Sequence, residues 1–467
     1  MKVKTLLTTA LLFGAMVVWS QEFGKYSILF AGGDGSKDNP YLIENPQQLS
    51  NLRSENGGVS IDAYFKLTGD IDISSFSAET WGVLGWEPIS VFHGHLDGNG
   101  YAITGLWINL SDPQLHQSSS KYDNAGLIGV LDGTVESLNI ETDDSKGGIV
   151  GCVNAGAIAG QLTGLVANCS VKGQVYGVSN MGSVVGGLIG KMSGQGRIEN
   201  SYVEGKVSHT PTTPFTAGGG YMGGLVGSMG NGNDLSRGED FFDSELKTTI
   251  TGCYVKADIS SMDAWTGGLV GQLGYGDISN CYISGNITGT GSSMIGGLAG
   301  NVTSLATVSN CYVSGKLGDG KEEYSAPVVA YVGMPFNSYT TSLTISNCYY
   351  RKDTDGLNSS LTGTRYDDTE WKKELSSLVP VNENVVDGEY IGEAKALTTI
   401  EMQTRSSFAG FDFEKVWEID EGEGFPYLRS IAGGQPQSPA AIAPVKVAAL
   451  QVYATDGVLY VSGLTAG

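Results

Sequence analysis

One phrase recurs along this sequence, and it constrains the fold more than any other feature. The phrase is Gly-Gly-Leu/Ile-Val/Ile/Ala-Gly, followed after a spacer by Ile/Val-x-Asn-Cys-Tyr-Val/Ile-x-Gly. It occurs at 267–271 with 278–285, and again at 296–300 with 308–315. One such unit is a pair of short strands that cannot bury its apolar side alone, so its stability must come from stacking on neighbouring units. The repetition therefore predicts a solenoid.

The spacing of apolar residues inside each copy predicts a corner. Ile278, Cys281 and Ile283 are spaced three and then two, whereas a continuous strand would space them two and two. The residue at this corner varies only between asparagine and glycine: Asn168, Asn200, Gly252, Asn280, Asn310 and Asn347. Both residue types tolerate the left-handed backbone region, so a positive φ is expected there. An all-β, right-handed parallel β-helix that turns at an asparagine ladder fits this pattern best.

The first twenty residues have the pattern of a secretory signal. Lys2 and Lys4 precede an apolar run from Leu6 to Trp19, so we expect residues 1–20 to be removed on export. No later stretch approaches the roughly twenty apolar residues of a spanning helix, and no cysteine stands at the expected cleavage site to carry a lipid. The protein is therefore expected to be secreted or held at the cell surface, without a transmembrane segment.

The composition restricts the partners. The chain has 27 Lys and Arg against 49 Asp and Glu, for a net charge of −22. Nucleic acids and anionic membranes do not attract a negative partner, so neither is expected to bind. With 69 glycines and 16% charged residues, the chain is too rich in glycine for helices and too apolar for disorder. No cofactor is predicted.

Six cysteines in an exported protein would ordinarily indicate three disulfides. Five of them occupy the same point of successive repeats: Cys169, Cys253, Cys281, Cys311 and Cys348. Stacked rungs hold equivalent Cβ atoms about 4.8 Å apart, whereas a disulfide needs roughly 3.8 Å. The five are therefore predicted to be reduced and buried, and Cys152 lies outside this register.

The chain divides into six predicted regions. These are a signal peptide at 1–20, an N-terminal capping module at 21–125, the repeat β-helix at 126–350, a C-terminal cap at 351–431, a Pro/Gly-rich linker at 432–449 and the start of a truncated β domain at 450–467. Short helices are expected at 46–53 and 398–405, and a strand pair begins at Leu450.

The repeats resemble the GLUG-motif repeats of exported bacterial surface proteins, a family that implies adhesins and β-helical stalks. The resemblance covers 126–350 and rests on the recurring Gly-Gly-Leu-Val-Gly and Asn-Cys-Tyr-Val-x-Gly phrases. The segments 92–100 and 417–428 are similar to those that flank such repeats. The tail from Leu450 to Val461 resembles the start of a C-terminal sorting domain of the Bacteroidetes type.

GLUG repeats also occur in immunoglobulin A metallopeptidases, whose zinc helix contains His-Glu-x-x-His. That motif is absent, and the four histidines are His93, His95, His116 and His209. The pair His93 and His95 would lie on one side of a strand, but two ligands are fewer than zinc ordinarily takes. No metal site is predicted.

Lyases and glycosidases on β-helices need converging carboxylates about 5–10 Å apart. Acidic pairs here are isolated in turns or at strand ends, as at 70–72 and 143–144. Solvated turn acids explain them better, so the chain is not predicted to be an enzyme.

One position beyond the cysteine, the repeats place a row of tyrosines, which are the candidate ligand-binding residues: Tyr202, Tyr254, Tyr282, Tyr312 and Tyr349. If the cysteine points inward, strand alternation points the tyrosine outward. An external tyrosine stripe can stack on sugar rings or on another protein. The alternative, which we favour, is an aromatic ladder that stabilises neighbouring rungs.

Two functions remain open. The first is a surface-displayed or secreted non-catalytic adhesin or stalk that binds glycans or the surface proteins of a host or a bacterium. The alternative is a secreted carbohydrate-active enzyme that uses a groove on the same helix. The sequence identifies neither the ligand nor the oligomeric state.

Overall fold

The computed structural model describes residues 29–53, 63–178, 182–210, 220–230, 247–291, 293–318, 325–332, 342–352, 389–392, 394–431, 451–455 and 458–462. The expected signal peptide and the linker lie outside these residues, as does 231–246, a segment rich in Asp and Gly between two repeats.

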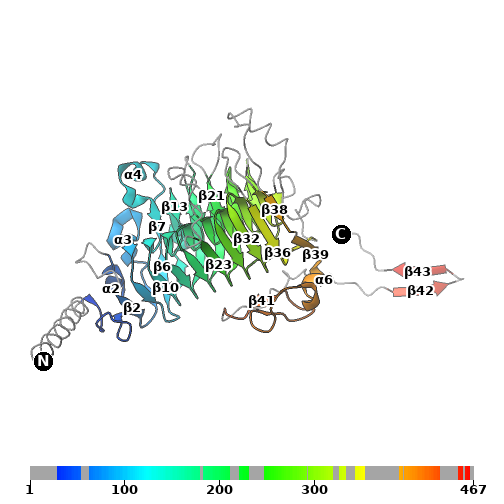
Figure 1. Cartoon of the computed structure of the whole chain (residues 1–467), viewed down its shortest axis with the longest axis horizontal. Coiled ribbons are helices and arrows are strands. Elements are labelled where there is room, and N and C mark those ends of the chain that lie inside the picture. The colour runs from blue at the N-terminus through cyan, green and yellow to red at the C-terminus, as the bar shows by residue number, and fades with distance from the viewer. Residues whose placement is uncertain are drawn as a thin grey trace, which may run out of the picture.

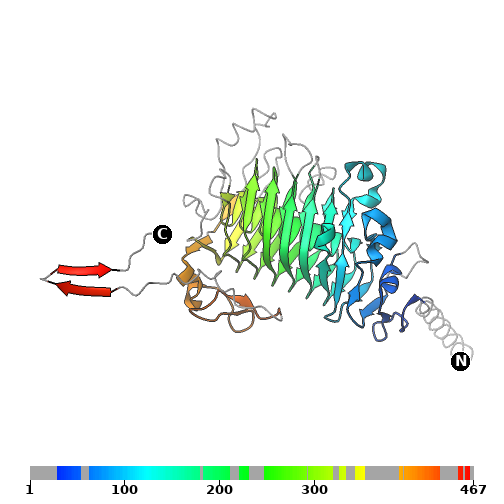
Figure 2. The same cartoon turned by 180° about the vertical axis from the view of Figure 1, so that it is seen from behind.

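The chain winds into a parallel β-helix, as the repeats predicted. Four sheets run along its length, and every strand pair within them is parallel; Figures 1 and 2 show the strands stacked along one axis. We name the sheets A to D.

Each sheet takes about one strand from each turn of the chain. Sheet A contains β1 (Tyr41–Ile43), β2 (Tyr64–Leu67), β5 (His95–Asp97), β10 (Thr134–Glu136), β15 (Leu165–Ala167), β19 (Arg197–Glu199), β23 (Thr248–Thr251), β27 (Gly276–Ser279), β32 (Leu305–Ser309), β36 (Ser342–Ser346) and β38 (Glu389–Ile391). Sheet B contains β3 (Ile71–Asp72), β6 (Ala102–Leu106), β11 (Asn139–Thr142), β16 (Ser170–Gly177), β20 (Tyr202–His209), β24 (Tyr254–Met262), β28 (Tyr282–Ile283), β33 (Tyr312–Val313), β37 (Cys348–Arg351) and β39 (Ala394–Leu397), with β7 (Ile108–Asn109), β12 (Ile149–Gly151) and β29 (Ile287–Thr290) at its side.

The other two sheets carry the glycine-rich phrase. Sheet C contains β4 (Ile89–Phe92), β9 (Ile128–Leu131), β14 (Ala159–Leu162), β18 (Ile189–Met192), β22 (Val226–Met229), β26 (Val270–Leu273), β31 (Ala299–Val302) and β35 (Val329–Val332). Sheet D contains β8 (Asn124–Ala125), β13 (Asn154–Ala155), β17 (Val184–Gly186), β21 (Tyr221–Gly223), β25 (Trp265–Gly267), β30 (Met294–Gly296) and β34 (Ser325–Ala326).

The glycines of the phrase are required where sheet D meets sheet C. A Cβ on Gly271 would lie 2.3 Å from the backbone nitrogen of Met222 and 2.5 Å from the carbonyl oxygen of Gly227. Such distances are far below van der Waals contact, so only glycine lets the two backbones touch. Leu269, between the two strands, is fully buried in the core. The repeated phrase therefore encodes a corner at which two sheets meet backbone to backbone.

The asparagine corner lies between sheets A and B, and it has the predicted conformation. Positive φ values of 47° to 64° occur at all six predicted positions: Asn168, Asn200, Gly252, Asn280, Asn310 and Asn347. Backbone hydrogen bonds join neighbouring rungs at this corner; for example, the N–H of Asn280 donates to the carbonyl of Ser309 at 3.0 Å. The amide side chains of Asn347 and Asn310 are hydrogen-bonded at 3.0 Å. Ser137, with φ 53°, takes the corner of the first copy, which the sequence did not reveal.

All six cysteines are free and buried, as predicted for the five in register. The thiol of Cys281 donates to the carbonyl of Ser279 at 3.1 Å, and the thiol of Cys311 does the same to Ser309. Cys152, outside the register, donates to the carbonyl of Leu110 at 2.6 Å. Burial raises the pKa of Cys169 to about 12, so this thiol is unreactive at neutral pH.

The parallel stacking starts earlier than the repeats do. Strands β1, β2 and β5 already stack in sheet A, within the expected capping module. Short helices lie beside the strands in the N-terminal part of the β-helix. The helices are α2 (Pro46–Ser50), α3 (Phe76–Trp81), α4 (Pro113–Ser118), η3 (Gly82–Leu84), η4 (Ser120–Tyr122) and η5 (Asp144–Lys146). The expected helix at 46–53 is thus present, whereas the domain boundaries stay predictions.

After β39 in sheet B, residues 398–431 form a small aromatic layer against that sheet, which we call the cap. It contains α6 (Thr399–Met402), η7 (Arg405–Ser407), β40 (Trp417–Glu418) and β41 (Tyr427–Leu428). The side chain of Thr398 and that of Glu401 form a capping box at the start of α6, where a helix was expected. The expected strand pair at the chain's end is the antiparallel hairpin of β42 (Gln451–Thr455) and β43 (Val458–Ser462). Among the described residues, no helix is long and apolar enough to cross a bilayer.

Candidate functional site

The five predicted tyrosines form one row along sheet B. Tyr202, Tyr254, Tyr282, Tyr312 and Tyr349 are register partners on successive strands. The first four rings stack nearly parallel, with centroid distances of 4.6, 5.0 and 5.1 Å between neighbours. The row is therefore the aromatic ladder that the register predicted, and we call it the tyrosine ladder.

The expectation that this ladder is exposed is wrong, because the cap covers it. Tyr282 and Tyr312 are 1% and 0% exposed, and only Tyr202 is half-buried. The ring of Trp417 lies 6.1 Å from that of Tyr282 and 5.9 Å from that of Tyr312. The hydroxyl of Tyr312 donates to the carbonyl of Pro426 at 2.5 Å, and that of Tyr349 donates to the carbonyl of Ala409 at 2.9 Å. The rings point out of the β-helix, but they point into a second core.

At its N-terminal end the ladder stops at Tyr202. The register partner of Tyr202 on the preceding strand is Ser170, and the partner of Ser170 is Asn139. Burial raises the pKa of Tyr254 and of Tyr312 above their ordinary values, so the buried hydroxyls stay protonated. This geometry favours the structural alternative, and the ligand-binding role of the five tyrosines stays an untested prediction.

A groove that sequence reasoning missed lies on the outer side of sheet A, next to its corner with sheet C. Its two banks are rows of side chains. Thr134, Leu165 and Arg197 are register partners on β10, β15 and β19 and form the sheet bank. Thr249 on β23 is the register partner of Arg197 and continues this row. The second row, the corner bank, consists of the residues that lie two positions earlier in the sequence on each of the four rungs: Asp132, Thr163, Gln195 and Lys247.

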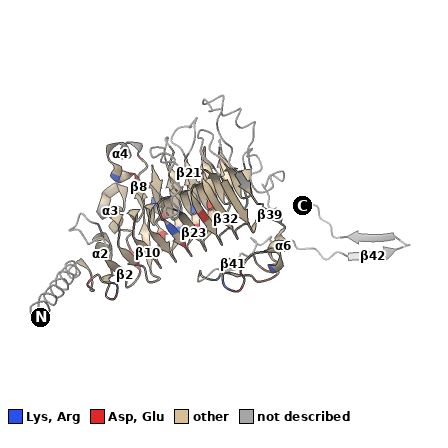
Figure 3. Ribbon diagram, viewed as in Figure 1, with Lys and Arg blue, Asp and Glu red and all other residues tan. Residues whose placement is uncertain are grey.

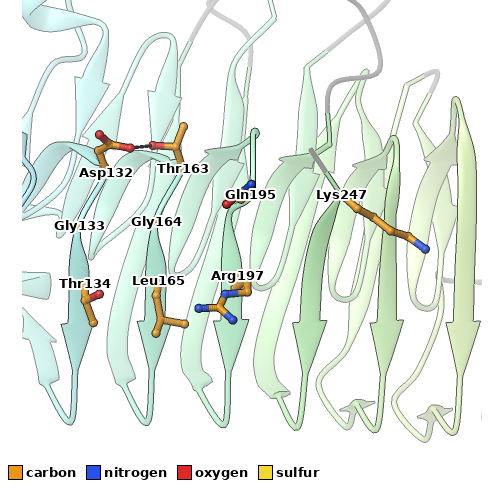
Figure 4. Close-up of a pocket in the computed structure, with 9 residues that line it drawn as sticks. All are labelled: Asp132, Gly133, Thr134, Thr163, Gly164, Leu165, Gln195, Arg197 and Lys247. Carbon is orange, nitrogen blue, oxygen red and sulfur yellow. Dashed lines mark hydrogen bonds between the residues drawn. The ribbon is translucent and has the colours of Figure 1, made fainter. Parts of the chain in front are cut away.

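Glycines separate the two banks. Gly133 and Gly164 line the groove, and the equivalent residue on the third rung is Gly196. A Cβ on Gly164 would lie 2.0 Å from the carbonyl oxygen of Gly133, so the stacked backbones leave no room for a side chain here. The result is an open trough of about 600 Å³ with a floor of peptide groups. Figure 4 shows the two banks along neighbouring rungs.

The groove has both acidic and basic groups. Asp132 accepts a hydrogen bond from the hydroxyl of Thr163 at 2.7 Å, and its other oxygen lies 2.8 Å from Nδ1 of His93. These hydrogen bonds, that from Thr163 first, hold the pKa of Asp132 below its ordinary value. Asp132 is thus a charged acceptor at neutral pH.

The two cations differ in their surroundings. The ammonium of Lys247 pairs with Asp277 at 2.8 Å, and Figure 4 shows the side chain pointing away from Arg197. The guanidinium of Arg197 lies 3.9 Å from Glu199, at the limit of an ion pair, and its side chain is 54% exposed. Figure 3 shows acidic and basic residues mixed on this side of the helix. Arg197 is therefore an exposed cation that lines the groove and can donate to a ligand.

His93 and His95 are paired with carboxylates, not with each other. Nε2 of His95 lies 2.8 Å from Oε1 of Glu136, as Nδ1 of His93 does from Asp132. Within the described ranges, no three His, Cys, Asp or Glu side chains form a group that could hold a metal ion. Two of the acids that we expected to be solvated turn residues accept hydrogen bonds from backbone N–H groups. Asp70 accepts one from Ala102, and Asp72 accepts one from Ser74.

Solved structures with a similar fold include a protein from Bacteroides ovatus provisionally named an immunoglobulin A1 protease. It matches with a TM-score of 0.46 and 18% identity, over 86% of this chain and 96% of that one. A second chain, named IgA1 protease, matches with the same values over 80% of this chain and 27% of that one. The likeness is weak and concerns the fold alone.

These matches correct one expectation. We expected a chain without catalytic activity, because the His-Glu-x-x-His motif is absent and the acidic pairs are isolated. Solved chains of similar fold are named as proteases, so the fold does not support that exclusion, and we do not retain it.

Two relatives with sequence similarity are much longer proteins. A protein of Evansella cellulosilytica with the provisional name Gly-rich membrane protein is 37% identical over 156 residues, which are 31% of this chain and 16% of that protein. Halomucin of Haloquadratum walsbyi is 29% identical over 364 residues, 66% of this chain and 4% of its own length. The chain thus spans a small part of both relatives. Within the repeat region, residues 181–208 and 266–288 match the GLUG motif, so the chain contains this motif at least twice.

Proposed function

We propose that this protein is an exported surface or secreted stalk that binds glycans or the surface proteins of a host or a bacterium. The observation that carries the proposal is the stack of GLUG-type rungs with an open polar groove along one wall. A long stack of rungs is a rigid spacer, and the groove is a place where a ligand can reach several rungs at once.

The names of the relatives support the location. One is named a Gly-rich membrane protein and the other halomucin, and both names fit a protein at the cell surface or outside the cell. We propose in addition that residues 1–20 are a signal peptide and that the hairpin of β42 and β43 begins a C-terminal sorting domain. In this proposal the cap at 398–431 closes the β-helix, and the region at 432–449 links it to the sorting domain.

The test uses the full exported chain, fluorescently labelled, on arrays of glycans and of host and bacterial surface proteins. Saturable binding to one class of ligand is the expected result, and the bound glycan is then analysed for cleavage, which would identify an enzyme. Antibody staining of intact, unpermeabilised cells that express the chain should detect it outside. Binding to nothing on either array, or staining only after permeabilisation, would contradict the proposal.

A further inference from the structure

We propose that the groove between the two banks of sheet A binds a neutral linear glycan that lies along the axis of the β-helix. This inference rests on the proposed function, because it assigns the ligand class and the site to the binding activity proposed above. It is carried by the shape, the hydrogen-bonding groups, the charge balance and the spacing of the groove.

The shape favours an extended ligand. Gly133 and Gly164 form a floor under two successive rungs, and side chains of the two banks line the groove on either side. A chain molecule can therefore rest on peptide groups while it contacts side chains to its left and right. A globular partner would instead need a broad contact surface, and a trough does not offer one.

The side chains suit hydroxyl groups, which donate and accept at once. Asp132 is a charged acceptor, the amide of Gln195 both donates and accepts, and Arg197 donates from a planar fork. The hydroxyl of Thr134 can do either, and that of Thr163, whose proton is donated to Asp132, can accept. Neighbouring hydroxyls of one sugar ring can bridge such a donor and acceptor, and this combination specifies polyhydroxylated ligands more than peptides or lipids.

The charges favour a neutral ligand over an acidic one. Lys247 is neutralised by Asp277 at 2.8 Å, so the groove has one acid, Asp132, and one available base, Arg197. The net charge of the whole chain is −22, which repels polyanions at long range. An acidic polysaccharide would meet both the repulsion of the whole protein and the charge of Asp132.

The spacing gives the direction of the ligand. Equivalent side chains on neighbouring rungs recur about every 4.8 Å along the axis, which is close to the length of one pyranose unit in an extended glycan. Each successive sugar would then meet the corresponding pair on the next rung: Asp132 with Thr134, Thr163 with Leu165, and Gln195 with Arg197. Leu165 offers the middle sugar an apolar contact, which carbon-bound hydrogens of a sugar face can use.

The experiment is isothermal titration calorimetry of the full chain with three probes: cellotetraose, maltotetraose and tetragalacturonate. We expect a neutral tetramer to bind and the anionic one to bind at least about tenfold more weakly. Arg197→Gln and Asp132→Asn should each weaken the neutral tetramer about tenfold or more, since each removes charge-assisted hydrogen bonds. Affinity for the neutral probe should change little between low and high NaCl.

Matched controls carry the same chemical changes elsewhere. Lys191→Gln removes a cation from the exposed face of sheet C, and Asp258→Asn removes an exposed acid from sheet B. Both should bind the neutral tetramer as the parent does. Arg197 is more than half exposed, so its variant is expected to fold even if Asp132→Asn loses stability with its bonds to Thr163 and His93.

The outcomes separate the inference from the proposed function. Unchanged affinity in both groove variants, or preference for tetragalacturonate, overturns the inference while a glycan-binding stalk stands. A protein that binds surface proteins but none of the three tetramers and no neutral glycan on the array also overturns it. Failure to bind any glycan or protein contradicts the proposed function itself.

Discussion

The tyrosine ladder should be a structural joint between the β-helix and the cap, and Tyr312 tests this best. Its ring is fully buried between the ring of Tyr282, 5.1 Å away, and the aromatic residues of the cap. Tyr312→Ala removes the ring from two packed layers at once, so it should cost about 3–5 kcal/mol of unfolding free energy, as buried aromatic truncations do. Tyr312→Phe keeps the ring and loses only the hydrogen bond to Pro426; it should cost about 1–3 kcal/mol, because a buried carbonyl is left unpaired.

Tyr202 is the matched control at the other end of the same ladder. Its ring is half-buried and stacks on one neighbour, Tyr254, at 4.6 Å. Tyr202→Ala should therefore cost about 1 kcal/mol, the size of a stacking contact plus modest burial. The order of stability should be parent, Tyr202→Ala, Tyr312→Ala, with Tyr312→Phe between the parent and Tyr312→Ala.

The assay is guanidinium unfolding followed by tryptophan fluorescence, because Trp417 lies within the cap cluster, fully buried and stacked on Phe411 at 4.5 Å. Limited proteolysis measures in parallel whether the cap is released before the β-helix unfolds. If Tyr312→Ala unfolds like Tyr202→Ala, and the fluorescence and proteolysis of the cap are unchanged, then the cap does not rest on the ladder and the reasoning is refuted.

Three further predictions follow from the backbone and from buried groups. Asn280 has φ 52°, so Asn280→Ala should cost about 1–2 kcal/mol and Asn280→Gly less; equal or reversed chemical stabilities would contradict the corner. The buried thiols, with the pKa of Cys152 raised to about 11 by burial, should react with Ellman's reagent only after denaturation without reductant, and a denatured yield near zero would indicate disulfides. Burial lowers the pKa of His209, so the unfolded chain binds more protons between the lowered folded pKa and about 6.5, and stability should fall as pH drops through about 6.5. His209→Asn should reduce this slope in unfolding measured from about pH 7 to about pH 5, and an identical slope in both proteins would show that another group is responsible.

The stacking could be predicted from the sequence because an alignment of the repeats shows which residues lie over one another on neighbouring rungs. Aligning the copies places Asn280 over Asn310 and Cys281 over Cys311, and the choice of asparagine or glycine at one point specifies a backbone conformation. Each of these signals lies within one repeat, where residues close in sequence determine the geometry. The corner and the reduced thiols were accessible for this reason.

The burial of the tyrosine ladder could not be predicted in the same way. Trp417 and Phe411, which are among the residues that cover it, lie more than sixty residues beyond the last tyrosine, and no repeat pattern connects them to it. Strand alternation correctly predicts that Tyr312 points away from the β-helix core. It does not predict whether the space outside is solvent or another part of the chain.

The groove was missed for a third reason. Its residues differ from rung to rung, so Asp132, Thr163 and Gln195 do not look alike in an alignment of repeats. They become one bank only when the register of β10, β15 and β19 is applied to the residues two positions earlier. The glycines at 133, 164 and 196 were the signal that could have found it, because a glycine repeated next to a strand leaves space between two rows of side chains.

The most direct test of the account is a crystal structure of the protein with a neutral tetrasaccharide that binds in solution. The account predicts that its density runs along the axis of the β-helix over Gly133 and Gly164, with Asp132 and Arg197 within hydrogen-bonding distance of sugar hydroxyls. Density on another wall of the helix, or on a tyrosine ladder from which the cap has moved away, would contradict it.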